Sequence, residues 1–390
     1  MNEILDRKIS EMVDMAFECS CGRSHSVDIK KIFIERNITR RILDTLAPYK
    51  KGKILLVADN NTFRISGKQI KEALDLHGFS SGCHVFESRG PLVPDEKAVG
   101  RLIIEMDEET ALILAVGSGT LNDLSRMVSH KLGIPYMIAG TAPSMDGYAS
   151  TVSPLIVQGM KKTYKAVYPV AIFGDLDAMM NSPKEMICAG FGDLLGKYTA
   201  LADWKLSASI NGEYLCPTCV TLVNNAIEKC IADKEGIAAR NENAIRYLAE
   251  ALIMTGIAIG LARDSRPASG SEHHLAHYWE TDALARGVEH PLHGNSVGVG
   301  TVVISHIYKM VGRTYNINDM GAPDPDMVKG LLRAVGAADN PFDLGIDKKV
   351  FTESVLHAKE IRPRYTVLHL AEKLGILESA AFRLTEMFYG

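Results

Sequence analysis

The chain has 390 residues, 46% of them hydrophobic and 23% charged, which is an ordinary globular composition and enough chain for two domains. Its net charge of −4 offers no basic excess to hold a phosphate backbone, which argues against nucleic acid as a partner. The N-terminus has no basic head followed by an apolar stretch, and the longest apolar region, residues 248–262, falls short of a bilayer span. With seven scattered cysteines, these features predict a cytoplasmic protein without a membrane segment or a disulfide scaffold.

The first half of the chain alternates apolar strands with helices. A helix over residues 43–49 ends at Lys50-Lys51-Gly52, and residues 53–58 follow as an unbroken apolar run, typical of a strand covered on both faces. The predicted elements that continue the alternation are a helix over 65–77, a strand over 82–86, a helix over 97–107, a strand over 111–116, a helix over 121–132 and a strand over 134–138. This alternation predicts a parallel sheet with right-handed crossovers, whose ligands bind beyond the carboxyl ends of the strands.

Three of these strands end in residues suited to a nucleotide. Gly117-Ser118-Gly119-Thr120-Leu121 leads into a helix whose N-terminus offers N–H groups to a pyrophosphate, although Asn122 replaces the third glycine of the dinucleotide fingerprint. The next strand ends in a second small-residue loop, containing Thr141-Ala142-Pro143-Ser144 and Ser150, which offers hydroxyls and amides. The alternative for both loops is a tight turn without a ligand. Asp59, after the first strand, could bind a ribose diol or cap the next helix, and these roles are compatible.

The alternation ends after residues 169–175, and the second half shows long periodic stretches typical of helices. They cover residues 183–207, 217–233, 241–263, 271–285, 293–311 and 326–335. We therefore predict an N-terminal Rossmann-like α/β domain with a parallel sheet, residues 1–180, and an all-α C-terminal domain, residues 181–390. The nucleotide is expected in the first domain, the metal and substrate in the second, and the nicotinamide in the cleft between them.

A candidate metal site lies in the second half. In the segment Ser269-Gly270-Ser271-Glu272-His273-His274-Leu275-Ala276-His277, helix spacing does not decide which two histidines act together, and His293 follows shortly after. A catalytic divalent ion usually takes mixed nitrogen and oxygen ligands and keeps one position open. Asp193, set among glycines and apolar residues where an unpaired charge would be costly, supplies the carboxylate. Asp193, His273 and His293 make a two-histidine, one-carboxylate set; the alternatives are a solvated helix face and a helix-capping aspartate.

Two groups of cysteines remain outside this set. They are Cys19-Ser20-Cys21 with His25, and Cys216-Pro217-Thr218-Cys219. Together they could form a structural zinc site, but neither group has a partner at standard zinc-finger spacing. Buried or surface thiols are the simpler interpretation.

Taken together, these motifs resemble the metal-dependent polyol dehydrogenases that share a fold with dehydroquinate synthase. Within that superfamily the chain is most similar to the bacterial glycerol-1-phosphate dehydrogenases, and the resemblance spans most of its length. It rests on Gly117-Ser118-Gly119, Thr141-Ala142-Pro143-Ser144 with Asp146, Gly192-Asp193, Ser265-Arg266-Pro267-Ala268-Ser269-Gly270-Ser271-Glu272-His273 with His277, His293-Gly294, Val297-Gly298-Val299-Gly300-Thr301, and Cys19-Ser20-Cys21-Gly22 with His25.

The resemblance implies a role for individual residues. It implies that Asp193, His273 and His293 bind the metal, selecting His273 over His274, and that Asp146, Asp193 and His277 contact the substrate. The residues it implies for binding the nicotinamide cofactor are Asp59, Gly117, Ser118, Gly119, Thr120, Leu121, Thr141, Ala142, Pro143, Ser144 and Ser150. It also implies a homodimer and one divalent metal per subunit, nickel in bacterial members and zinc as the alternative.

We therefore expect NADH- or NADPH-dependent, reversible reduction of dihydroxyacetone phosphate to glycerol 1-phosphate. Lys197 and Arg266 are the basic residues nearest in sequence to the proposed site and are candidates for binding the phosphate, with a surface charge as the alternative for each. The rival functions are an unphosphorylated polyol dehydrogenase, a dehydroquinate synthase-like lyase that uses NAD transiently, and a regulator that binds a metal or nucleotide without catalysis. The chirality of the product is not decided by the sequence.

Overall fold

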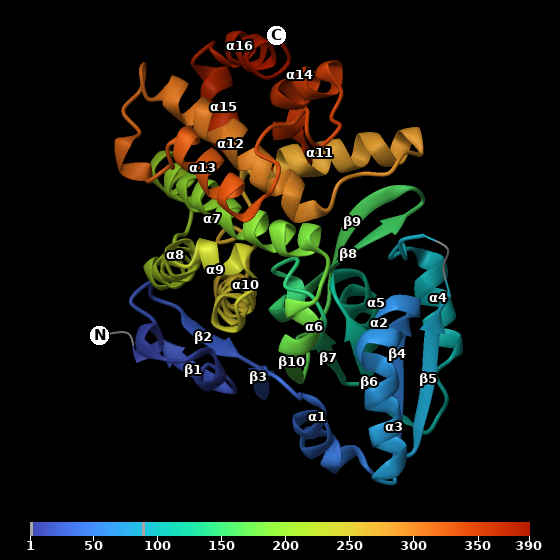
Figure 1. Cartoon of the computed structure of the whole chain (residues 1–390). Coiled ribbons are helices and arrows are strands. Elements are labelled where there is room, and N and C mark those ends of the chain that lie inside the picture. Colours follow the sequence, from blue (N-terminus) through green and yellow to red (C-terminus); the bar gives the residue numbers. More distant parts are fainter. Residues whose placement is uncertain (1–2, 88–89) are drawn as a thin grey trace.

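A computed structural model describes residues 3–87 and 90–390. Its first half is built on a six-stranded sheet in which every neighbouring pair is parallel, with strand order β3-β10-β7-β6-β4-β5 (Figure 1). The strands of this sheet are β3 (Lys31–Glu35), β4 (Lys53–Asp59), β5 (Ser81–Phe86), β6 (Thr110–Gly117), β7 (Tyr136–Gly140) and β10 (Ala171–Asp175). The predicted parallel sheet is thus confirmed, and the four predicted strands are β4, β5, β6 and β7.

Helices cover both faces of the sheet, which explains the unbroken apolar runs of its strands. The helices of this half are α1 (Thr39–Leu46), α2 (Asn60–Thr62), α3 (Lys68–Leu76), α4 (Glu96–Ile104), α5 (Gly119–Leu132) and α6 (Leu176–Met180), with a π-helical turn η4 (Phe63–Gly67) before α3. Along β4, Leu56 packs with Ile42 of α1 and Leu74 of α3, while Leu55 and Val57 belong to the opposite core with α4 and α5. Alternate residues of one strand therefore fill two separate cores.

Several strands were not predicted. The antiparallel hairpin β1 (Met15–Glu18) and β2 (Ser24–Val27), the edge strand β3, and the antiparallel hairpin β8 (Val152–Val157) and β9 (Met160–Lys165) lie in stretches without a clear apolar run. In β9 the pattern Met160-Lys161-Lys162-Thr163-Tyr164-Lys165 is mostly polar, and the strand is defined by its pairing with β8. Strands with exposed faces give a weak signal in sequence.

The second half is helical, as predicted. Its helices are α7 (Lys184–Asn211), α8 (Pro217–Ala232), α9 (Lys234–Ala238), α10 (Glu242–Ala262), α11 (Ser271–Arg286), α12 (His293–Val311), α13 (Pro325–Val335), α14 (Lys348–His357), α15 (Val367–Lys373) and α16 (Leu377–Tyr389). Six of them match the predicted helical stretches, while α9, α14, α15 and α16 were not predicted. The last three pack with α11 and α12 around Trp279 and Phe351 in a core separate from that of the sheet (Figure 1). The division at residue 180 remains a prediction.

Helix α10 is long and apolar enough to cross a membrane by length and composition, but 72% of that stretch is buried inside the protein. It lies against α8 and the loop that contains Asp146, where a Cβ on Gly256 would be 2.8 Å from the Asp146 carbonyl oxygen. Burial of this kind identifies α10 as a core helix.

Glycines set the distance between α7 and α12. A Cβ on Gly192 would lie 2.4 Å from the carbonyl oxygen of Gly294, and a Cβ on Gly294 would lie 1.9 Å from that of Ala189. Only glycines allow the two backbones to approach this closely. The residues next to these glycines are Asp193 and His293, so the close crossing of α7 and α12 brings the proposed ligands together.

Candidate active site

Asp193 forms an ion pair with Lys197, which follows one helical turn later on α7. Both side chains are fully buried. The Lys197 ammonium lies 2.5 Å from Asp193 Oδ1 and 2.7 Å from Asp146 Oδ2, and the Asp146 amide donates to Asp193 Oδ2 at 3.0 Å. The structure therefore pairs Lys197 with two carboxylates of the site instead of leaving it for a phosphate.

This pairing keeps buried groups charged. Burial by itself would raise the pKa of Asp193, but the ammonium of Lys197 and the His273 ring together lower it below the usual range. Burial would likewise lower the pKa of Lys197, and Asp146 and Asp193 raise it instead. A carboxylate that stays ionised in a dry site is a suitable ligand for a cation.

Asp193, His273 and His293 converge although they come from three different helices. One ligand atom from each lies within 4.8 Å of the other two. His273 Nε2 is 3.5 Å from Asp193 Oδ1, and the His273 and His293 ring centroids are 5.2 Å apart. Two imidazoles and one carboxylate fit a divalent ion and leave coordination positions for a substrate.

A carboxylate supports each of these two histidines. His273 Nδ1 is 2.7 Å from Glu272 Oε1, and His293 Nδ1 is 2.7 Å from Glu280 Oε1. When Nδ1 donates to a carboxylate, Nε2 is the atom that can bind a metal, and such pairs orient most metal-binding histidines in proteins. Glu272 and Glu280 are both buried and were not recognised from the sequence, although Glu272 stands inside the histidine motif.

A second group, His277, Glu280 and His293, also meets the distance requirement for a metal. Glu280 already forms a hydrogen bond with Nδ1 of each histidine. His277 Nδ1 lies 3.2 Å from Glu280 Oε2, and His293 Nδ1 lies 2.7 Å from Glu280 Oε1. A metal at that point would have to replace both hydrogen bonds and compete with Lys161, which lies 2.5 Å from Glu280 Oε2. A metal in the group that contains Asp193 can bind Nε2 of both histidines and leave their Nδ1 hydrogen bonds to Glu272 and Glu280 intact, so this group is the better site.

His277 lies one turn after His273, beside the candidate ligands. Its ring centroid is 6.2 Å from that of His273 and 5.2 Å from that of His293. Burial, and then the nearby Lys161 ammonium, lower the pKa of His277 well below its usual range, so the ring is neutral. With Nδ1 facing Glu280, Nε2 is left facing Arg362, whose Nη2 lies 3.3 Å away.

Two cations near the site were not predicted from the sequence. Lys161 comes from the β8–β9 hairpin, and Arg362 follows the 3-10 turn η7 (Ala358–Ile361) near the end of the chain. Arg362 is 85 positions from His277, and no local pattern connects them. Arg266, which had been a candidate for phosphate binding, instead forms a two-point ion pair with Glu213, at 2.7 and 2.5 Å, and donates to the Tyr365 carbonyl oxygen.

His274 points away from this group. It is fully buried, and neither ring nitrogen has a hydrogen-bond partner among the described residues. Burial lowers its pKa well below the usual value, so it is a neutral core residue. The structure separates His273 from His274, which helix spacing had not done.

The predicted cofactor residues gather along one edge of the sheet. Gly117 and Gly140 end the adjacent strands β6 and β7 in register, and the Thr141 amide donates to the Gly117 carbonyl oxygen at 3.1 Å. Asp59 ends β4, the next strand, and its Oδ1 accepts from the amides of Asn61 and Thr62 at 2.9 and 2.8 Å. The capping role predicted for Asp59 is therefore present, and the ribose role stays a prediction.

Exposure divides these cofactor candidates into two sets. Asp59, Ser118, Gly119, Thr120 and Ser144 are partly exposed at the edge. Leu121 and Ala142 are 2% exposed, Gly117 and Pro143 are also buried, and the Ser150 hydroxyl accepts from the Val152 amide. The first set can contact a ligand directly, whereas the second shapes the loops. A Cβ on Gly117 would lie 2.3 Å from Leu121, so this glycine is also required for packing.

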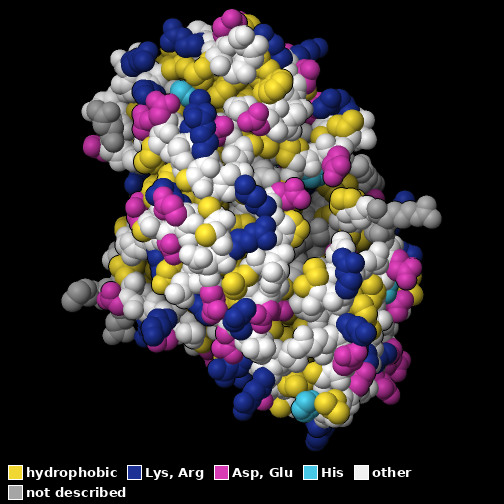
Figure 2. All heavy atoms as spheres, in the orientation of Figure 1, with side chains coloured by type: hydrophobic (Ala, Val, Ile, Leu, Met, Phe, Trp, Pro, Cys, Tyr) yellow, Lys and Arg dark blue, Asp and Glu magenta, His cyan; other side chains and the backbone are white. Residues whose placement is uncertain are grey.

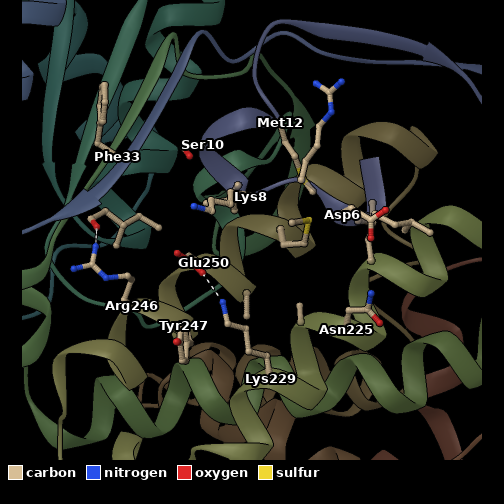
Figure 3. Close-up of a pocket in the computed structure, with 18 of the residues that line it drawn as sticks. Asp6, Lys8, Ser10, Met12, Phe33, Asn225, Lys229, Arg246, Tyr247 and Glu250 are labelled. Atoms are coloured by element: carbon tan, nitrogen blue, oxygen red, sulfur yellow. Dashed lines mark hydrogen bonds and ion pairs between the residues drawn. The ribbon is translucent and has the colours of Figure 1, made fainter. Parts of the chain in front are cut away.

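The surface shows two depressions of different kinds. In Figure 2 a hollow separates the helical upper part from the lower right part that carries the sheet. A pocket of about 730 Å³ lies elsewhere, lined by the N-terminal turns, β3, α8 and α10, with Arg246, Tyr247 and Lys229 pointing toward it (Figure 3). None of the predicted site residues lines this pocket, and the ion pair of Lys229 with Glu250 at 3.0 Å partly neutralises its charge.

Comparison with known proteins finds relatives that are named as dehydrogenases and match almost the whole chain. A glycerol-1-phosphate dehydrogenase [NAD(P)+] from Halalkalibacterium halodurans is 36% identical over 91% of this chain and 95% of its own length. The chain belongs to the glycerol-1-phosphate dehydrogenase family. Another member, from Geobacillus stearothermophilus, is 33% identical over 96% of this chain and 100% of its own length.

Two wider comparisons show what else this glycerol-1-phosphate dehydrogenase family member is similar to. Residues 33–183 match the iron-containing alcohol dehydrogenase family. The solved structure of sulfoacetaldehyde reductase from Bifidobacterium kashiwanohense in complex with NAD+ has a TM-score of 0.70 with 17% identity, covering 93% of this chain and 98% of that one. At that identity the likeness shows the fold alone. The predicted family, fold class and dehydrogenase function are confirmed by these comparisons.

Proposed function

We propose that this protein catalyses the reversible, metal-dependent reduction of dihydroxyacetone phosphate to glycerol 1-phosphate with NADH or NADPH. The observation that carries the proposal is the convergence of Asp193, His273 and His293, with a carboxylate behind each histidine, beside a neutral His277 and the cation Arg362. Relatives named for this activity cover almost the whole chain.

Asp193, His273 and His293 would hold the ion, nickel by the family resemblance and zinc as the alternative. An ion held there would supply Lewis-acid chemistry, stabilising the negative charge that develops on the carbonyl oxygen while a nicotinamide supplies hydride to the carbonyl carbon. Lys197 keeps the Asp193 and Asp146 carboxylates fixed and partly neutralised, so the ligand set is pre-positioned. Asp146 lies in the same loop as the cofactor residues and is proposed to contact the substrate.

His277 is proposed to bind the substrate hydroxyl through Nε2. Its Nδ1–H is held by Glu280, and its low pKa leaves Nε2 unprotonated, so the substrate hydroxyl can take the place of the Arg362 guanidinium on this atom when Arg362 binds the phosphate. In the direction of alcohol oxidation this atom can accept the hydroxyl proton, and in the direction of ketone reduction it can return it.

Arg362 is proposed as the main cation for the substrate phosphate. It is partly buried, and burial lowers the pKa of its guanidinium, a sign that few waters solvate it. A planar guanidinium suits two-point contact with a phosphate. Lys161 is the weaker candidate, because Glu280 already pairs with it.

The cofactor is proposed to bind at the edge formed by Asp59, Ser118, Gly119, Thr120 and Ser144. Loop glycines and the N-terminus of α5 suit a pyrophosphate, and the Asp59 carboxylate would repel a 2′-phosphate, which favours NADH over NADPH. We also propose a cytoplasmic homodimer with the active site between the two halves of each chain.

The decisive experiment uses protein that has been treated with a chelator and reloaded separately with Ni²⁺ and Zn²⁺. With dihydroxyacetone phosphate, we expect the NADH absorbance of the reloaded protein to fall only when a metal is present. The Asp193→Asn variant should show no such fall. An enantiomer-specific assay of the product then gives its chirality. Activity only with unphosphorylated glycerol and NAD⁺ would replace the proposal with a polyol dehydrogenase, and no net change in NADH in either direction would reject a dehydrogenase.

A further inference from the structure

Another cluster of side chains of the types that bind metals shares no residue with the proposed active site and is not used by the proposed reaction. Cys19 and Cys21 are in the turn of the β1–β2 hairpin, and His25 is on β2. Cys216 is the N-cap of α8, almost two hundred positions later. Neither segment contains a complete set of ligands, which is why no zinc-finger spacing exists in the sequence.

The four side chains form a closed group. One ligand atom from each lies within 4.8 Å of all the others. The Sγ atoms of Cys19 and Cys216 are 3.8 Å apart, and His25 Nε2 lies 3.3 Å from Cys21 Sγ and 3.5 Å from Cys216 Sγ. For zinc bonds of about 2.3 Å to sulfur and 2.0–2.1 Å to nitrogen, a tetrahedron has edges of about 3.8 Å between sulfurs and about 3.5 Å between sulfur and nitrogen. The observed separations are those of a tetrahedral site.

Neighbouring hydroxyl groups complete the surroundings. Thr218 Oγ1 lies 3.1 Å from Cys19 Sγ, and the Tyr214 hydroxyl lies 3.1 Å from Cys21 Sγ. Cys216 stands at the N-terminus of the 16-residue α8, where the helix dipole favours a thiolate. Cys19, His25 and Cys216 are at least 92% buried. If these sulfurs are thiolates, both hydroxyls donate to them, and such outer partners orient the ligands of a metal site.

We propose that Cys19, Cys21, His25 and Cys216 bind a structural zinc ion, distinct from the metal of the active site. Three thiolates and one imidazole match a Cys₃His zinc site, and all four positions are occupied by protein, which leaves none for a substrate. A disulfide would use only two of the three sulfurs and leave the imidazole unexplained.

The zinc would attach the N-terminal hairpin to the helical half. A two-stranded hairpin with strands of four residues is not stable alone in water. Binding of the ion joins it to the start of α8, and the loss of thiol protons on binding makes the affinity depend on pH. The tetrahedral site would therefore add a second anchor to residues 15–27, beside the apolar burial of Val27 and Cys19.

The first test measures metal content in the purified holoprotein. All proteins are purified with zinc and reductant. Asp193→Ala, which removes a ligand of the other site, is expected to retain one equivalent of zinc at this site, as wild type does. Cys216→Ser is expected to lose one equivalent of zinc and to lower the melting temperature by several degrees. Cys83→Ser, which changes an exposed cysteine on β5, is the control and should match wild type in both measurements.

A second measurement starts from wild-type protein and does not depend on the cysteine variants folding. Protein reconstituted with Co²⁺ should show sulfur-to-cobalt charge-transfer absorption, and this band should persist in Asp193→Ala. Folded Asp193→Ala protein that holds no zinc and gives no sulfur-to-cobalt band would overturn the proposal. A thiol titration that finds Cys19 and Cys216 oxidised to a disulfide in the active wild-type enzyme would also overturn it. The readouts are independent of catalysis, so a failed activity assay does not affect them.

Discussion

Glu280 connects His293 to His277: its Oε1 lies 2.7 Å from His293 Nδ1 and its Oε2 lies 3.2 Å from His277 Nδ1. One buried carboxylate thus fixes the ring orientation of a proposed metal ligand and of the residue proposed to bind the substrate hydroxyl. Lys161 is the cation that compensates for the carboxylate's burial. Because both rings depend on Glu280, a change there should affect metal binding and proton transfer together.

Replacement of Glu280 by glutamine tests this dependence. The amide keeps the size of the side chain but accepts fewer bonds and leaves Lys161 without its partner charge. Metal affinity is expected to fall by roughly 10–100-fold, the usual effect of losing an outer partner of a metal-binding histidine. The measurement is competition with a chromogenic chelator, and Glu289→Gln on the exposed loop before α12 is the matched control. Unchanged affinity in Glu280→Gln would mean that His293 is oriented by something else.

Arg362→Gln should separate phosphate recognition from chemistry. We expect KM for dihydroxyacetone phosphate to rise about 10–100-fold, since a charge-assisted contact contributes roughly 1.5–3 kcal/mol. The rate with unphosphorylated dihydroxyacetone should change little. Arg313→Gln, at an exposed position after α12, is the control and should leave both substrates unaffected. An equal loss with both substrates would instead assign Arg362 to positioning His277.

Gly192→Ala tests whether the close crossing of α7 and α12 builds the metal site. The new Cβ would meet the Gly294 carbonyl oxygen at 2.4 Å, so the helices must separate. The free energy of unfolding is expected to fall by more than about 2 kcal/mol, and metal affinity should fall with it. Gly330→Ala on α13 is the matched control, because nothing lies within 4 Å of its new Cβ, and it should stabilise the protein by roughly 0.5–1 kcal/mol. Denaturant unfolding and metal titration of both variants provide the comparison.

His306 on α12 should make stability depend on pH outside the active site. Burial lowers its pKa from 6.5 to about 4 in the folded protein, whereas the unfolded chain binds the proton near the ordinary value. The unfolded state therefore holds more protons between those values, so the stability present above pH 6.5 is lost as the pH falls toward 4.

The size of this effect is limited by the partial exposure of the ring. After allowance for solvent screening we expect a loss of about 1–2 kcal/mol across that window. Urea unfolding of wild type and His306→Gln at several pH values measures it, and the variant should lose less stability on acidification. Parallel pH profiles for the two proteins would contradict the prediction.

Much of the architecture follows from local patterns in the sequence. Unbroken apolar runs predict β4, β6 and β7, because a strand buried on both faces shows no polar alternation. Long stretches with helical spacing of apolar residues predict α7, α8, α10, α11 and α12. Asp193, His273 and His293 could also be selected as candidate ligands from the sequence. Several histidines within one helix and an aspartate among glycines and apolar residues are an unusual pattern that suggests a metal site. The hairpins β1–β2 and β8–β9 could not be predicted from the sequence, because their exposed faces are polar and break the apolar pattern.

The sequence by itself determined the fold class, the edge of the sheet where the cofactor is proposed to bind and the residue types of the proposed divalent-metal site. Only the tertiary structure decided which histidine faces Asp193, that Lys197 neutralises two carboxylates, and that Lys161, Glu280 and Arg362 surround His277. It also decided that Cys216 meets Cys19, Cys21 and His25. The physical reason is that periodicity reports which face of an element is buried, while contacts between residues far apart depend on how closely helices pack, which here is set by glycines at the crossing of α7 and α12.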